Sequence, residues 1–447
     1  MRRTFPMPIL RPALWCALAV VVALAWPPRP AEAVLELDIT EGIVEPLPIA
    51  ITELHGETPA AQQRGREIAE VVSADLERSG LFRPIDRRAF IQSPAELQGL
   101  PRFGDWRQIN AQALVTGTIA GGEEGGDIEV EFRLWDVFAG IQMRGLRFAT
   151  SADNWRRVAH QIADAVYARI TGEEPYFDTR IVYVSESGPR TDRVKRLAIM
   201  DQDGVNHQFL TDGANLVLTP RFHPNATQIA YMAYRGPVPH VYLLDLASGR
   251  EQKLGDFAGM TFAPHFSADG RLVAMSLAEG GNSDIYTFDL ISRVQRRLTD
   301  HQAIDTSPSF SPDGRRLVFN SDRAGTPQLY VMNVDGSGVQ RISFGSGRYG
   351  SPAWSPRGDL VAFTKIVGGL FHIGVMRPDG SDERLLTRST LDESPTWAPN
   401  GRVILFTREN YGTDRSRLFS IDVTGYNERE VPTPLDASDG NWSNLVP

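Results

Sequence analysis

Residues 307–343 read SPSFSPDGRRLVFNSDRAGTPQLYVMNVDGSGVQRIS, and this stretch is the clearest copy of a motif that recurs six times. An aromatic residue after a small-Pro-x step recurs every 43 to 45 residues, at Phe222, Phe266, Phe310, Trp354, Trp397 and Trp442. A second anchor recurs every 44 or 45 residues, at Ala198, Tyr242, Tyr286, Tyr330, Gly374 and Phe419. A period of this length, built from short strands and turns, predicts a toroid of four-stranded sheets.

Each repeat contains three recognisable strands. The first carries the aromatic anchor and ends in a turn such as 311–314 (SPDG), in which Pro presets φ and Asp-Gly allows a tight reversal. The repeat set is permuted, because the chain enters at a second strand (Ile181) and leaves on a first strand (Trp442). We therefore expect residues 176–447 to form a six-bladed propeller, in which the C-terminal strand pairs with the first blade and leaves no sheet edge exposed.

Residues 1–33 have the pattern of a secretory signal. Arg2 and Arg3 precede the apolar run 13–26, and Ala31-Glu32-Ala33 gives a cleavage site, so we expect a mature start at Val34. The only cysteine, Cys16, lies in this segment, which predicts a mature chain without disulfides. Removal of the segment changes the formal net charge from −9 to about −12, which argues against nucleic acid and anionic membranes as partners.

Residues 34–175 alternate between strand and helix patterns and predict an α/β domain. We expect strands at 48–52, 81–85 and 112–119, a hairpin of 128–137 with 141–150, and a helix over 59–79 stopped by Gly80. A second helix, capped by Asn154, should end at Gly172. Residues 34–42 form one more strand at the start of the mature chain.

The whole mature chain resembles the TolB family of the Tol–Pal system of Gram-negative bacteria. The resemblance rests on the SPSFSPDG-type repeats, on LDESPTWAPNG at 391–401, on DGNWS at 439–443, on SADLERSG at 73–80 and on the start LELDITEGIVEPLPIAI. It implies a periplasmic interaction scaffold without catalysis or cofactor, monomeric and without a membrane span. Its expected partners are the lipoprotein Pal, bound by the propeller, and TolA, bound by the mature N-terminal strand, in support of outer-membrane integrity and cell division.

The loops before the aromatic strands are the candidate surface for Pal, because the family binds it at that face of the ring. The matching residues are Leu218, Thr219, Met260, Thr261, Asp305, Thr306, Ser307, Tyr349, Asp392, Glu393 and Ser394. The alternative for the Ser and Thr residues is that they only shape turns before proline. The family often has a histidine where this chain has Met260.

The second candidate surface is the strand at 34–42, in which apolar and acidic residues alternate: Leu35, Glu36, Leu37, Asp38 and Ile39. It is either an edge strand of the α/β domain or a mobile, detachable strand that a partner recognises by strand addition.

Enzymatic alternatives remain open. A propeller hydrolase or lactonase would need a metal in the channel, and a cation such as calcium could bind where Asp305, Asp392 and Glu393 rim the mouth. The histidines show no H-x-H or H-x-x-x-H spacing, no G-x-S-x-G occurs, and the acidic turn 201–204 is interpreted as a turn rather than a calcium loop. A glycan-binding propeller would need exposed aromatics on the channel face, where we expect only Tyr349.

Overall fold

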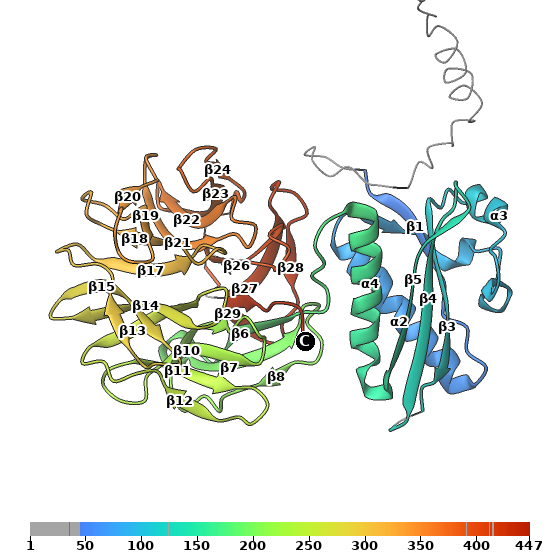
Figure 1. The fold of residues 1–447 in the computed structure, drawn as a ribbon, viewed down its shortest axis with the longest axis horizontal. Coiled ribbons are helices and arrows are strands. Elements are labelled where there is room, and N and C mark those ends of the chain that lie inside the picture. The colour runs from blue at the N-terminus through green and yellow to red at the C-terminus, as the bar shows by residue number, and fades with distance from the viewer. Residues whose placement is uncertain (1–34, 36–44, 124, 390, 411, 414) are drawn as a thin grey trace, which may run out of the picture.

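The computed structural model describes residues 35, 45–123, 125–389, 391–410, 412–413 and 415–447. An α/β domain and a ring of sheets lie next to each other (Figure 1). The predicted signal segment 1–33 and all of the predicted strand 34–42 except Leu35 lie outside the described residues. Among the described residues, no helix has both the length and the apolar character needed to cross a membrane.

The α/β domain is built on a five-stranded sheet in the order β2-β1-β3-β4-β5. Its strands are β1 (Leu47–Ile51), β2 (Phe82–Pro84), β3 (Ala113–Gly121), β4 (Asp127–Asp136) and β5 (Ile141–Ser151). Side chains alternate between the two faces, so Ile49 and Ile51 enter the core beneath the two long helices while Ala50 enters a second core around Trp106. The two long helices therefore cover one face of the sheet, and shorter elements cover the other.

Local signals explain the ends of the two long helices, α2 (Pro59–Arg78) and α4 (Trp155–Thr171). The Thr58 hydroxyl accepts a hydrogen bond from the Ala61 N–H at the start of α2, and Gly172 ends α4 with a left-handed φ of 69°. Asn154 occupies the N-cap position of α4 as predicted, but its amide donates to the hydroxyls of Thr150 and Ser151 of β5 and its side chain does not cap the helix. The short elements α3 (Phe103–Gln108), η1 (Arg87–Ala89) and η2 (Pro94–Leu97) were not expected from the sequence.

The second part of the chain is a six-bladed propeller, as the repeats predict. Five blades follow chain order, from β9–β12 to β25–β28, and the remaining blade has the order β29-β6-β7-β8. In that blade β29 (Asp436–Trp442), the C-terminal strand, pairs with β6 (Arg180–Ser187) from Asp436 opposite Glu186 to Trp442 opposite Ile181. The predicted closure of the ring is thus observed. The blade strands run as follows: β7 (Val194–Asp201), β8 (Gln208–Phe209), β9 (Val217–Phe222), β10 (Gln228–Ala233), β11 (His240–Asp245), β12 (Glu251–Lys253), β13 (Met260–Phe266), β14 (Leu272–Glu279), β15 (Asn282–Asp289), β16 (Gln295–Arg297), β17 (Asp305–Phe310), β18 (Arg316–Ser321), β19 (Gln328–Asn333), β20 (Gln340–Arg341), β21 (Arg348–Trp354), β22 (Val361–Val367), β23 (Leu370–Met376), β24 (Arg384–Leu385), β25 (Asp392–Trp397), β26 (Val403–Asn410), β27 (Arg415–Asp422) and β28 (Arg429–Val431).

The aromatic anchors join neighbouring blades. Trp354 of β21 packs in one cluster with Val318 of β18, which belongs to the preceding blade, and Trp397 of β25 packs with Ala362 of β22 in the same way. Burial of a large aromatic at a blade boundary contributes favourable free energy there. The period of the repeat is therefore the period of the blade contacts.

Several contacts fix the α/β domain against the propeller. Glu173, just after α4, contacts Arg357 of one blade and lies 3.7 Å through Oε1 from Arg402 Nη1 of the next. At the ring closure, the Trp442 indole N–H donates to the Thr179 hydroxyl at 2.7 Å. The linker is thus held by both the domain behind it and the blades ahead of it.

Candidate functional site

The six first strands share one distortion at the channel. Each has a β-bulge next to a residue in the left-handed region, with φ between 46° and 56°, and none of these residues is glycine: Thr219, Ala263, Ser307, Ser351, Ser394 and Asp439. Such a conformation is costly for these side chains and persists only where the surroundings enforce it. Here the freed N–H groups find partners on the neighbouring blade, as when Ser307 N donates to Ser276 Oγ at 3.1 Å and Ser394 N to Thr364 Oγ1 at 3.2 Å.

The predicted Pal surface divides into accessible and buried residues. Seven of its members retain exposure near the starts of the first strands: Leu218, Thr219, Met260, Thr306, Ser307, Glu393 and Ser394. Four are buried: Thr261, Asp305, Tyr349 and Asp392. A partner that approaches this mouth contacts the seven accessible residues. The four buried residues can affect binding only by holding the accessible ones in place.

Asp305 and Asp392 do not rim the channel, contrary to expectation. Each is 0% exposed and accepts two hydrogen bonds from one guanidinium, Asp305 from Arg323 at 2.8 and 3.0 Å and Asp392 from Arg408 at 2.7 and 3.0 Å. Each arginine also stacks on aromatic rings of its own blade. These two carboxylates thus hold loops in place. Of the three residues expected to surround a channel cation, only Glu393 is exposed, and the cation stays a prediction.

Tyr349 is also misplaced by the sequence interpretation. Its ring is 1% exposed in a core with Phe363, and its hydroxyl donates to Glu383 at 2.9 Å. Lys365 completes the group, with its ammonium 4.8 Å from the ring centre. The residue is therefore an interior anchor, and it offers no exposed aromatic surface to a glycan.

Acidic side chains also gather at the mouth. Glu393 keeps an exposed surface, but partial desolvation and the neighbouring Asp439 and Glu409 carboxylates raise its pKa above the usual range. Asp439 Oδ2 accepts a hydrogen bond from Thr219 N at 3.3 Å, and this bond joins β29 to β9. The mouth therefore combines acidic groups with the apolar side chains of Met260 and Leu218.

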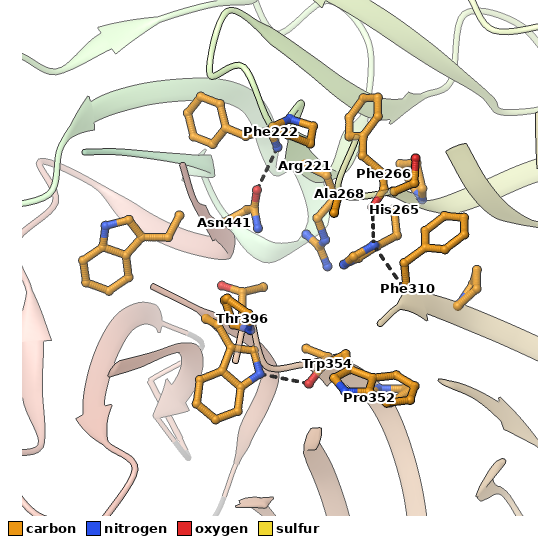
Figure 2. A pocket seen from close by; sticks show the side chains of 18 of the residues that line it. Arg221, Phe222, His265, Phe266, Ala268, Phe310, Pro352, Trp354, Thr396 and Asn441 are labelled. Atoms are coloured by element: carbon orange, nitrogen blue, oxygen red, sulfur yellow. Dashed lines mark hydrogen bonds between the residues drawn. The ribbon is translucent and has the colours of Figure 1, made fainter. Parts of the chain in front are cut away.

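Below the mouth, the residue before each aromatic anchor forms a second ring, which we call the channel ring: Arg221, His265, Ser309, Ala353, Thr396 and Asn441. Figure 2 shows four of them, Arg221, His265, Thr396 and Asn441. All except buried Ser309 line a cavity of about 400 Å³. Three of these side chains connect adjacent first strands: Asn441 accepts from Phe222 N at 2.8 Å, Ser309 accepts from Trp354 N at 3.0 Å, and Thr396 donates to Gly440 O at 3.0 Å. This ring was not predicted from the sequence, although the fixed position of its members in the repeat could have revealed it.

One contact in this ring bears on the hydrolase alternative. Ser309 Oγ lies 3.2 Å from His265 Nε2, but the other ring nitrogen, Nδ1, faces the carbonyl of Phe266 at 3.0 Å instead of a carboxylate. Burial, reinforced by the Arg221 charge, lowers the pKa of His265 to about 4. Such an imidazole is a poor general base at neutral pH, so the pair is not an activated nucleophile.

Comparisons with known proteins agree with this architecture. A family model described as the TolB beta propeller domain matches residues 167–446, and one described as the TolB amino-terminal domain matches residues 35–143. The Tol-Pal system protein TolB of Paramagnetospirillum magneticum is 58% identical over 221 residues, which span 49% of this chain and 49% of that protein. The crystal structure of TolB from Acinetobacter baumannii has a TM-score of 0.80 at 26% identity and covers 92% of this chain and 100% of its own. With both domains matched in order, and the propeller model alone matching more than half of its length, the chain belongs to the TolB family.

Proposed function

We propose that this protein is a periplasmic interaction scaffold of the Tol–Pal system that binds Pal at the propeller mouth and has no catalytic activity. The observation that carries the proposal is the match of the complete two-domain architecture to TolB over 92% of the chain. The mouth supplies what a protein partner needs: an accessible ring of small, apolar and acidic side chains on a rigid support.

TolA is the second proposed partner, through the strand at 34–42. Of that strand the structure describes only Leu35, which packs against a hydrophobic cluster formed by both the α/β domain and the propeller. A segment that can either rest on its own domain or pair with another protein is suited to recognition by strand addition. Pal binding and TolA binding are coupled if Pal changes how often the strand 34–42 is released, because each partner then alters the affinity of the protein for the other.

The proposal is tested by comparing the mature chain with a variant that lacks residues 34–42. Both are immobilised, and capture of Pal and of the periplasmic part of TolA from the same genome is measured. We expect the full mature chain to bind both partners, and the shortened chain to lose TolA while it keeps Pal with equal or greater affinity. Unchanged binding of both partners by the shortened chain would refute the role of the strand 34–42 and its coupling to Pal. Failure of the full mature chain to bind Pal would refute the proposed scaffold function.

A further inference from the structure

Three side chains from two domains converge where the α/β domain meets the first blade. His160 belongs to α4, whereas Asp201 and Asp203 lie at the end of β7 and in the turn that follows it. One potential ligand atom of each residue lies within 4.8 Å of the other two. The fold thus assembles an N/O donor set from residues whose spacing in the sequence shows no metal-binding motif.

His160 is poised as a ligand. It is 3% exposed, and its Nδ1 lies 2.6 Å from Asp75 Oδ2, so this nitrogen carries the proton and donates it to the carboxylate. Nε2 is buried and has no hydrogen-bond partner. A carboxylate behind one imidazole nitrogen and an unpartnered second nitrogen is the arrangement that orients metal-binding histidines.

The supporting carboxylate is itself fixed. Asp75 Oδ1 accepts hydrogen bonds from Gln202 and Arg78, both at 2.8 Å, and the Asp75 side chain is fully buried. Because Gln202 lies between the two aspartates of the turn, the same turn that supplies the oxygen ligands also holds the group behind the imidazole.

The charges around the cluster favour a further cation. Three carboxylates, from Asp75, Asp201 and Asp203, face two guanidinium groups, from Arg78 and Arg156. The side chains of these aspartates are at most 18% exposed, so their carboxylates have little access to bulk water. Carboxylates gathered in such a place are stabilised by a cation between them.

We propose that this cluster binds a divalent transition-metal ion, with Zn²⁺ the best fit, through His160 Nε2 and one oxygen each of Asp201 and Asp203. One imidazole and two carboxylates suit zinc, and water completes the tetrahedron. Donor atoms on one tetrahedral zinc ion lie about 3.4 Å apart, so donors that are up to 4.8 Å apart must close up by more than about 1 Å. Arg156, which contacts Asp203, must also release one oxygen of that carboxylate.

Such an ion would connect the two domains directly. Its nitrogen ligand comes from the α/β domain and its oxygen ligands come from the propeller, so metal uptake would strengthen their docking. Metal binding at this interface is separate from partner binding at the mouth, and the test of one does not depend on the other.

The test uses the untagged mature protein after treatment with a chelator. Zn²⁺ is titrated by calorimetry, and Co²⁺ is added as a spectroscopic probe whose visible absorption reports the geometry of its ligands. We expect one ion per chain and at least tenfold weaker binding in His160→Gln and Asp203→Asn. The matched control is His301→Gln, which alters an exposed histidine outside the cluster and should bind as the wild type does.

Absence of binding by the wild type, or equal binding by His160→Gln, would overturn the proposal. If His160→Gln does not fold, as judged by circular dichroism, the more exposed Asp203→Asn decides alone.

Discussion

Replacement of Trp442 by alanine probes the closure of the ring. Trp442 is the last residue of β29 and pairs with Ile181 of β6. It therefore lies where the C-terminal strand of the chain completes the blade that β6 begins. It is 7% exposed, its N–H donates to Thr179 Oγ1 at 2.7 Å, and its ring meets Tyr176 edge-on at 6.0 Å. The substitution removes all of these contacts at once.

The expected loss of unfolding free energy follows from those contacts. Deleting a buried tryptophan side chain costs about 3–5 kcal/mol, and the lost hydrogen bond adds about 1 kcal/mol. Trp397 is a matched comparator, because it is also 7% exposed and its N–H donates to Ala353 O at 2.9 Å, but it lies at an ordinary blade boundary. If the seam is a true blade contact, Trp442→Ala and Trp397→Ala should cost the same within about 1 kcal/mol.

The assay is equilibrium unfolding in urea, followed by circular dichroism so that the lost tryptophan does not alter the signal. Tyr426→Ala serves as the control, since this side chain is 53% exposed and its loss should change the unfolding free energy by less than about 0.5 kcal/mol. A loss below about 1 kcal/mol for Trp442→Ala, together with a full loss for Trp397→Ala, would refute closure by β29 as a source of stability.

Three further predictions concern the mouth and the channel. Asp392→Asn should lower the unfolding free energy by about 3 kcal/mol because Arg408 loses its buried partner, whereas Glu393→Gln at the adjacent exposed position should change it by less than about 0.5 kcal/mol; urea unfolding of both checks this. Glu393→Lys should weaken Pal binding at least tenfold with unchanged stability, as measured by calorimetry and thermal unfolding. The pKa of His265 is lowered to about 4 in the folded chain. Between about pH 7.5 and 5 the unfolded chain therefore binds a proton at this imidazole that the folded chain does not bind. The unfolding free energy should fall by about 2 kcal/mol over this range because of His265. His265→Asn should remove that part of the pH dependence, and an identical pH slope in the variant would show that the folded chain does not hold this imidazole neutral.

The propeller was predictable because one repeat is one blade. The aromatic anchors recur in the sequence at the spacing with which they pack between neighbouring sheets, and a chain that enters on a second strand can close only by returning a first strand. The long helices of the α/β domain were predictable for a related reason, since Gly80 and Gly172 mark their ends with left-handed backbone.

Side-chain direction in the loops was not predictable from the repeat. Asp392 and Glu393 are neighbours, yet Asp392 is turned inward by a guanidinium sixteen positions further along the chain while Glu393 faces solvent. Tyr349 is likewise drawn into the core by Glu383, which lies on a later strand connection. The approach of His160 to Asp201 depends on how the two domains dock, and no local pattern reports that.

Titration of the periplasmic domain of Pal into the mature chain tests the central claim most directly. The account predicts one Pal per chain, at least tenfold weaker binding to Glu393→Lys, and wild-type affinity for Glu57→Lys, which alters an exposed carboxylate of the α/β domain. Absence of binding to the mature chain, or equal weakening by both variants, would contradict recognition of Pal at the propeller mouth.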